Sequence, residues 1–180
     1  MQVRLSNIPD DGLNLRFSRG GDWFFKLLSR KDRCDFSLDR IDINCQLNKI
    51  REKVDVKGEI VTEFDLECCR CLDRFKLPVK VEFEYTFSPD PGCFDEDLEL
   101  SHEELGMNYY SDSTIDIDDI IVEQIILQVP ISPLCKESCK GLCKICGINL
   151  NVVECGHKVE TKENAFAKLK DFKIEKGMKQ

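Results

Sequence analysis

The sequence has no long hydrophobic run: its longest unbroken apolar stretches, such as Ile120 to Val122, are three residues. A secretion signal needs a longer apolar core, and a membrane helix needs about 20 apolar residues. We therefore expect a cytoplasmic protein with no signal peptide and no membrane contact. The 180 residues, 42% apolar and 33% charged, suit one soluble globular domain or one domain plus a small module.

The sequence also lacks the motifs that mark common catalytic sites. It contains no Gly-rich phosphate loop, no nucleophile elbow and no carboxylate pair with a basic partner. We therefore expect a protein that is not an enzyme and has no small-molecule substrate. The aromatic triplet Trp23, Phe24 and Phe25 is expected to belong to the core rather than to a base-stacking platform.

Basic residues are missing from the middle of the chain. Residues 81–135 hold 14 Asp and Glu and no Lys or Arg, whereas residues 136–180 hold 10 Lys against 6 acids. This asymmetry, in a chain of net charge −8, favours a surface that faces a polyanion at the C-terminal end. Two solvated faces of opposite charge are the alternative interpretation.

Cysteine is the abundant exception, with 11 of 180 residues. A protein in a reducing cytosol does not rely on disulfides for stability. Clustered cysteines there are typical of metal ligands or catalytic thiols. We therefore expect zinc before disulfides.

The clearest secondary-structure signal is an alternation of apolar residues with period two. It runs from Val54 to Leu66 and resumes from Phe75 to Phe87, which predicts two long strands joined as an antiparallel hairpin. The connection Glu67–Arg74 places the first cysteines at the hairpin tip. Pro78 within the second strand favours an edge strand or a bulge.

The rest of the chain is also rich in predicted strands. They give an α+β fold that is mainly antiparallel β, a sheet or small barrel with a few helices and a zinc-binding C-terminal section. We divide the chain into an antiparallel β domain, 1–130, and a Cys-rich zinc module with a basic tail, 131–180. The predicted elements are strands at 3–8 and 13–17 joined by a turn at 9–12, a helix at 22–30, a strand at 36–47, an irregular connection at 88–113, and an amphipathic helix at 116–129 with Asp116 or Asp118 as its N-cap.

The cysteine spacing is that of zinc knuckles. In Cys143-Lys-Ile-Cys146-Gly147 two intervening residues let both thiolates face one ion, and glycine permits the tight turn behind them. The same Cys-x-x-Cys spacing recurs at Cys68 and Cys71. One pair alone is also compatible with a redox dithiol, but two pairs with further cysteines nearby predict metal sites.

Eight residues are predicted ligands, which is enough for two tetrahedral zinc sites. The preferred partition joins Cys68 and Cys71 to Cys135 and Cys139, and joins Cys143 and Cys146 to Cys155 and His157. A competing partition groups Cys135, Cys139, Cys143 and Cys146 and joins Cys155 and His157 to the hairpin pair, and spacing alone does not exclude it. The other four cysteines are predicted to be ordinary thiols, with Cys45 buried on an alternating face: Cys34, Cys45, Cys69 and Cys93.

Three ordered motifs resemble the YceD family of bacteria and plastids. They are Leu66-Glu-Cys-Cys-Arg-Cys-Leu72, an Ile-Asp-Ile-Asp helix that leads into Gln128-Val-Pro-Ile-Ser-Pro-Leu-Cys135, and Cys139-Lys-Gly-Leu-Cys-Lys-Ile-Cys-Gly-Ile-Asn-Leu-Asn151. The resemblance covers about residues 50–172. It implies a ribosome-assembly or RNA-processing factor that supports accumulation of large-subunit ribosomal RNA. Similar members often end the last cluster with Cys-x-Cys, where this chain has Cys155-Gly-His157.

The predicted partner is ribosomal RNA or a pre-ribosomal particle. Closing the first zinc site would gather basic side chains that can contact phosphates, namely Arg70, Arg74, Lys136, Lys140 and Lys144. A short helix at 164–173 is expected to dock its apolar face on the body or on a partner. Two other functions stay open: an assembly factor that binds a basic ribosomal protein, and a thiol redox protein.

Overall fold

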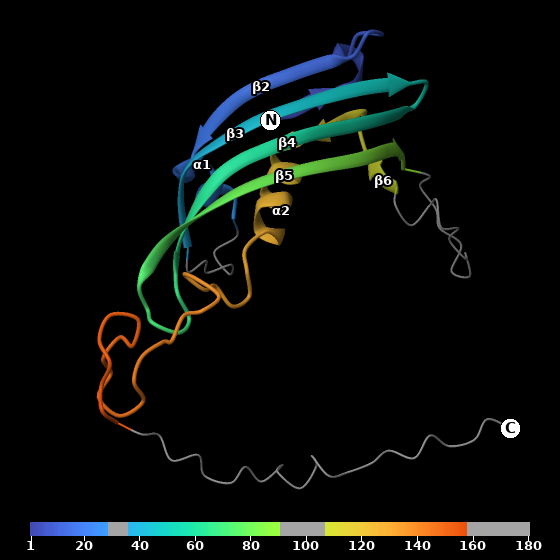
Figure 1. Cartoon of the computed structure of the whole chain (residues 1–180). Helices are drawn as coiled ribbons and strands as arrows, with labels where there is room; N and C mark the ends of the chain where they lie inside the picture. Colours follow the sequence, from blue (N-terminus) through green and yellow to red (C-terminus); the bar gives the residue numbers. More distant parts are fainter. Residues whose placement is uncertain (29–35, 91–106, 158–180) are drawn as a thin grey trace, which may run out of the picture.

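The main body of the protein is a five-stranded sheet. The computed structural model describes residues 1–28, 36–90 and 107–157 (Figure 1). The strand order is β2-β3-β4-β5-β6. The β2–β3, β3–β4 and β4–β5 pairs are antiparallel, and the β5–β6 pair is parallel. The prediction of a mainly antiparallel α+β fold is confirmed. The strands are β2 (Leu13–Gly20), β3 (Phe36–Ile50), β4 (Lys53–Glu67), β5 (Arg74–Pro89) and β6 (Met107–Tyr110).

The predicted hairpin of β4 and β5 is also confirmed. The two strands pair from Val54 opposite Phe87 to Glu67 opposite Arg74, with no irregularity in register. Pro78, which has no N–H to donate, lies in the part of β5 that has β4 on one side only, because β6 pairs with residues 86–89. The prediction of an edge position, rather than a bulge, is therefore the one that holds.

The N-terminus differs from its prediction. The strand expected over residues 3–8 is cut short to β1 (Gln2–Arg4), which is followed by the 3-10 helix η1 (Leu5–Asn7). Leu5 and Ile8, three residues apart, are both buried, a spacing that suits a tight helical turn rather than a strand. β1 pairs with β7 (Thr114–Asp116) in a separate two-stranded sheet, and β2 pairs with β3. The turn predicted at 9–12 is present, with the N–H of Gly12 donating to the carbonyl of Pro9 at 3.0 Å.

The two predicted helices form with shorter bounds, α1 (Gly21–Leu27) and α2 (Ile117–Leu127). The side chain of Asp116 accepts a hydrogen bond of 3.0 Å from the backbone N–H of Asp118, which confirms Asp116 as the N-cap of α2. Phe24 is fully buried and Trp23 packs against the core, as expected, but Phe25, also predicted to be core, is 36% exposed. No helix in the described ranges is long and apolar enough to cross a membrane.

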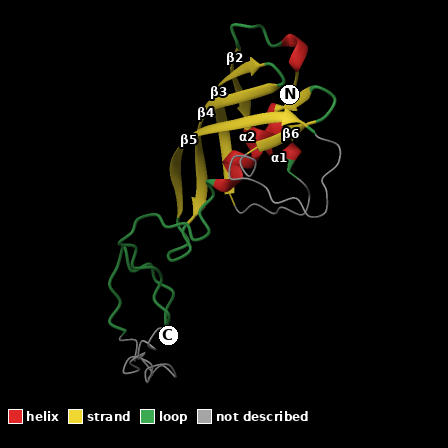
Figure 2. Ribbon diagram, turned by 90° about the vertical axis from the view of Figure 1, so that its right-hand side faces the viewer, coloured by secondary structure: helices red, strands yellow, loops and turns green. Residues whose placement is uncertain are grey.

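The core lies on one face of the sheet. Figure 1 shows the sheet arching over α2, and Figure 2 shows both helices on the same side of it. Side chains from the sheet, α1, α2 and the β1–β7 pair form one buried cluster, and Tyr85 of β5 accepts a 2.6 Å hydrogen bond from Gln124 of α2. The opposite face carries cross-strand ion pairs, Lys57–Glu84, Lys76–Glu63 and Lys80–Glu59.

Cys45 is buried in this core, as predicted, and burial raises the pKa of its thiol to about 11. The thiol therefore stays protonated at neutral pH and behaves as a small apolar side chain. Cys34, Cys93 and the predicted tail helix at 164–173 lie outside the described residues.

The connection predicted to be irregular over residues 88–113 is partly regular. β5 continues to Pro89, and β6 begins at Met107 and adds to the sheet beside it. The Tyr110 hydroxyl donates a 2.8 Å hydrogen bond to the carbonyl of Glu52 in the β3–β4 turn, which anchors β6. Parallel pairing between distant segments is not encoded in a local pattern, so the sequence carried no signal for it.

Candidate metal centres

The first cysteine pair lies in the turn that joins β4 to β5. The N–H of Leu72 donates to the carbonyl of Cys68 at 2.9 Å, and the N–H of Cys68 donates to the carbonyl of Asp73 at 3.0 Å. Leu72 has φ 62°, a left-handed conformation that usually belongs to glycine. The turn is closed so tightly that the side chains of Cys68 and Cys71 lie on the same side.

The second cysteine pair repeats this turn. The N–H of Gly147 donates to the carbonyl of Cys143 at 2.9 Å, the bond that Leu72 makes in the hairpin. Gly147 has φ 72°, which confirms the prediction that glycine permits the tight turn behind Cys146. The two knuckles therefore share one backbone geometry, although only the second has glycine at its left-handed position.

The structure gathers the first group of predicted ligands at the hairpin tip. We name the sulfur atoms of Cys68, Cys71, Cys135 and Cys139, all within 4.8 Å of one another, centre 1. Cys68 Sγ lies 3.8 Å from Cys139 Sγ, and Cys71 Sγ lies 3.7 Å from Cys135 Sγ. A tetrahedral ion with Zn–S bonds of about 2.3 Å separates its sulfur ligands by about 3.8 Å. The S–S bond of a disulfide is about 2.05 Å long, so the observed distances between sulfur atoms suit a shared ion instead.

The second group forms centre 2, defined by Cys143, Cys146, Cys155 and His157, whose ligand atoms also lie within 4.8 Å of one another. Cys143 Sγ is 3.9 Å from His157 Nδ1. Three sulfurs and an imidazole nitrogen are a donor set that tetrahedral zinc accepts. Centre 2 is more open than centre 1, because Cys146 and His157 are exposed.

Hydrogen bonds from backbone N–H groups lower the pKa of Cys68 in centre 1 and of Cys143 in centre 2. Burial raises the pKa of Cys68, but hydrogen bonds from the backbone of Cys135, Cys71 and Arg70 outweigh it and lower that pKa to about 6. At centre 2, hydrogen bonds from the backbone of Cys146 and Ile145 lower the pKa of Cys143 to about 6. Both thiols are mainly thiolates at neutral pH, the form that binds metal.

The two groups could each hold a metal ion, and their composition is that of the preferred partition rather than the competing one. Centre 1 is long-range, because it joins the β4–β5 connection to the segment after α2, and Figure 1 shows these two parts meeting at one end of the sheet. Centre 2 is local to residues 143–157. Cys69, between two centre 1 ligands, is exposed and belongs to neither group.

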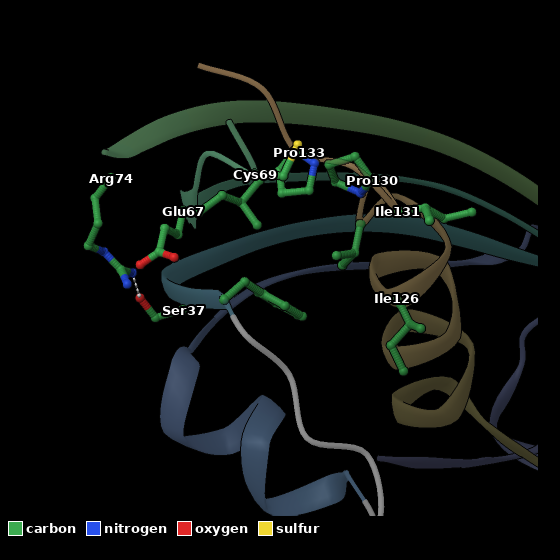
Figure 3. Close-up of a pocket in the computed structure, with 11 residues that line it drawn as sticks. Ser37, Glu67, Cys69, Arg74, Ile126, Pro130, Ile131 and Pro133 are labelled. Carbon is green, nitrogen blue, oxygen red and sulfur yellow. Dashed lines mark hydrogen bonds between the residues drawn. The ribbon is translucent and has the colours of Figure 1, made fainter. Parts of the chain in front are cut away.

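Cys69 instead lines a cavity of about 990 Å³ between the hairpin tip and the end of α2 (Figure 3). Its backbone N–H donates to the carbonyl of Pro133 at 2.9 Å, so the connection after α2 runs directly along the hairpin. Ile131, at the far wall, is fully exposed. Arg74 lines the same cavity and donates to Ser37 Oγ at 3.4 Å and to Asp65 Oδ1 at 2.9 Å.

Arg70, a predicted RNA contact, is engaged within the protein. Its guanidinium donates to the carbonyl of Cys139 at 3.0 Å, and its own carbonyl accepts from the N–H of Leu142 at 3.0 Å. Gly141 packs against the backbone of Arg70 and has a left-handed conformation with φ 73°. A Cβ at this position would lie only 3.0 Å from the carbonyl oxygen of Arg70, so glycine suits this close approach. Arg70 therefore fastens the hairpin tip to the chain that follows Cys139.

The three predicted lysines have exposed side chains around the centres. Lys140 Nζ lies 3.4 Å from Glu154 Oε1, an exposed pair of little energetic weight. Within the described part of the chain, Lys136 and Lys144 have no ion-pair partner. Arg70 and Arg74 are exposed as well, but their guanidinium groups donate to the carbonyl of Cys139 and to Asp65 Oδ1.

Two asparagines that the sequence analysis did not single out support the centres. Asn151 Nδ2 lies 3.3 Å from Cys139 Sγ, and Asn151 Oδ1 accepts from the N–H of Lys140 at 2.9 Å. Asn149 Nδ2 donates to Asp73 Oδ2 of the hairpin at 2.6 Å. The Asn-x-Asn spacing between Cys146 and Cys155 was the available signal, since Asn side chains often hydrogen-bond the backbone in turns.

Comparison with known proteins finds a family profile and several relatives that are similar to this chain. The profile described as "Large ribosomal RNA subunit accumulation protein YceD" matches residues 56–173, which include both centres. An uncharacterized protein of Mycobacterium tuberculosis is 33% identical over 129 residues, 72% of this chain and 60% of that protein. A Mycobacterium leprae relative, also uncharacterized, is 30% identical over 132 residues, 73% of this chain and 58% of that protein.

A plant protein is more distant. The maize "Large ribosomal RNA subunit accumulation protein YCED homolog 1, chloroplastic" is 25% identical over 132 residues, 61% of this chain and 45% of that protein. The chain thus spans about three fifths of the length of the mycobacterial relatives. No solved structure matches it. Because the profile match covers well over half of the sequence and carries both ligand groups, the chain belongs to the YceD family.

Proposed function

We propose that this chain is a non-catalytic, zinc-stabilised factor of ribosome biogenesis. It acts in the cytoplasm and supports synthesis, processing or accumulation of large-subunit ribosomal RNA. The observation that carries the proposal is the pair of four-ligand centres within the part of the chain that matches a family described by ribosomal RNA accumulation.

Zinc is the metal that best fits both donor sets. Four cysteine sulfurs, and three with one imidazole, are soft ligand sets that select zinc over the oxygen-loving Mg²⁺ and Ca²⁺. Centre 1 then fastens the module 131–180 to the β domain 1–130, and centre 2 gives the module its own fold. Each centre has a full set of four protein ligands, so neither leaves the open position that catalytic zinc requires.

The exposed lysines of the module contact the RNA phosphates. Lys136, Lys140 and Lys144 follow centre ligands by one residue each, so bound zinc fixes the backbone that presents them. Lysine ammonium groups contact phosphates without reading sequence. Two thiolate-rich centres bring the charge of the loaded protein to about −11, so RNA binding must rely on this local group of lysines.

We expect the triple variant Lys136→Gln, Lys140→Gln, Lys144→Gln to bind large-subunit ribosomal RNA at least 10-fold more weakly than the unmodified protein. Fewer phosphate contacts mean that fewer counterions are released on binding. The steepness of log affinity against log salt should therefore decrease by about 2 to 3. Fluorescence anisotropy with a labelled RNA fragment, repeated over a salt series, measures both quantities.

The matched control replaces Lys57, Lys76 and Lys80 by Gln. These lysines are also exposed, but each is paired with a glutamate on the sheet face, so RNA affinity should stay within about twofold. Equal loss in both triple variants would point to net charge rather than to a site. If neither variant weakened binding, the assignment of RNA contact to the module would be wrong.

Further measurements distinguish the two other functions. A factor that binds a basic ribosomal protein would show no tight RNA binding and would lose its partner when acids, not lysines, are removed. A thiol redox protein would form a reversible Cys68–Cys71 disulfide while loaded with metal. Zinc-bound thiols that resist alkylation would exclude that function.

A further inference from the structure

The loop inside centre 2 reaches back to centre 1. Residues 147–154 lie between the ligands Cys146 and Cys155, so an ion in centre 2 would hold both ends of this loop. The loop places the Asn151 amide 3.3 Å from Cys139 Sγ, a ligand of the other centre. No other side chain that is not itself a ligand makes a hydrogen bond to a centre 1 sulfur in the described residues.

Asn151 holds Cys139 from two sides. Its Nδ2 faces the sulfur, and its Oδ1 accepts from the N–H of Lys140, the residue after Cys139. The amide is itself fixed by Asn149, whose Oδ1 accepts 2.9 Å hydrogen bonds from Asn151 N and Asn151 Nδ2. The orientation of the amide, with its N–H₂ toward the sulfur, therefore depends on the shape of the loop.

The loop also contacts the hairpin that supplies the other two ligands of centre 1. Asn149 Nδ2 donates to Asp73 Oδ2 at 2.6 Å, just beyond Cys71. The carbonyl of Gly141 accepts from the N–H of Leu150 at 2.9 Å, and Leu142 donates to Arg70. One loop thus bridges the hairpin, the Cys135–Cys139 segment and centre 2.

We propose that Asn151 is a positioning residue that couples the two metal centres, so that an ion in centre 2 strengthens metal binding at centre 1. The inference rests on the proposed metal binding and goes beyond it. An N–H donor to a ligand thiolate stabilises the charged, metal-binding form of the ligand, and such outer partners are commonly worth 10–100-fold in metal affinity. Without an ion in centre 2 the loop loses its two fixed ends, and the donor is no longer held in place.

Linkage makes the coupling reciprocal. If centre 2 raises the affinity of centre 1 by some factor, then centre 1 must raise the affinity of centre 2 by the same factor. Two ions bound independently would show no such effect. Equality of the two factors is required of any coupling, so it checks the measurement, and the Asn151→Leu variants are what assign the coupling to the loop.

The test titrates Zn²⁺ into the metal-free full chain against a competing chelator of known affinity. Disabling centre 2 with Cys146→Ser should weaken centre 1 by about 10–100-fold. Disabling centre 1 with Cys68→Ser should weaken centre 2 by the same factor. Asn151→Leu, which keeps the branched shape of the side chain but removes the donor, should weaken centre 1 by about 10–100-fold with all eight ligands present.

The decisive comparison combines the two changes. In the Asn151→Leu background, Cys146→Ser should weaken centre 1 by less than about threefold, because the coupling contact is already gone. Asn44→Leu, an Asn on the solvated face of β3 far along the chain from the ligands, is the control and should leave both affinities unchanged. The far-ultraviolet circular dichroism of each variant checks that the sheet is folded.

Three contradicting outcomes have different meanings. Two ions bound with affinities that no variant couples would overturn the role of Asn151 and leave the zinc proposal standing. Absence of metal binding by the unmodified chain would overturn the proposed function itself. A fall in centre 1 affinity from Cys146→Ser that persists in full in the Asn151→Leu background would assign the coupling to another contact and contradict the inference.

Discussion

Removing metal from the purified protein is expected to unfold residues 131–157 and leave the five-stranded sheet folded. The buried side chains that this segment contributes are the ligands Cys139 and Cys143, while five of its large aliphatic residues are exposed. Without an ion the segment has no core to offset its conformational entropy. Structural zinc contributes about 10–16 kcal/mol in small zinc modules, which makes this the largest effect expected for the protein.

Hydrogen exchange with and without a strong chelator measures this result. Amides of 131–157 should lose protection, and amides in β3, β4 and β5 should keep theirs because the apolar core of the sheet contains no predicted zinc ligand. Adding excess Zn²⁺ should restore protection and serves as the control. Unchanged protection of 131–157 after the metal has left would contradict the structural role of the centres.

The second large effect concerns the sheet rather than the metal. Phe64→Ala should lower the free energy of unfolding by about 3–5 kcal/mol, because it empties a fully buried site. Phe64 is 0% exposed, and its ring centroid lies 5.1 Å from that of Phe36. Urea unfolding followed by circular dichroism of the sheet measures the change.

Val61→Ala on the same strand is the matched control. Val61 is on the solvated face and 41% exposed, so its loss should change the free energy of unfolding by about 0.5 kcal/mol or less. Both variants should still bind two zinc ions per chain at temperatures where the sheet is folded. Similar destabilisation by the two substitutions would contradict the assignment of the buried face.

Local patterns predicted the central fold well. The alternation from Val54 to Phe87 predicted β4 and β5, and the acids before Ile117 predicted the start of α2, because period and capping act between near neighbours. The pairing of β1 with β7 and of β5 with β6 joins segments far apart in sequence. Such pairing depends on tertiary packing, and no short-range pattern records it.

The ligand groups were also accessible from sequence, because two-residue spacing within a knuckle restricts the thiolates to one ion. The roles of Arg70 and Asn151 were not. Arg70 was expected to contact RNA, which stays a prediction; its guanidinium also donates to the carbonyl of Cys139, a backbone partner that side-chain patterns cannot reveal. Asn151 acts on a sulfur that its own sequence neighbourhood does not contain.

The most direct test of two separate zinc centres is the number of zinc ions counted by native mass spectrometry in saturating Zn²⁺. We predict two ions in the unmodified chain, one in Cys68→Ser, one in Cys155→Ser, and two in Cys69→Ser, which replaces the neighbour of a ligand. The account would be contradicted by one ion in the unmodified chain, or by two ions retained in Cys68→Ser and lost in Cys69→Ser.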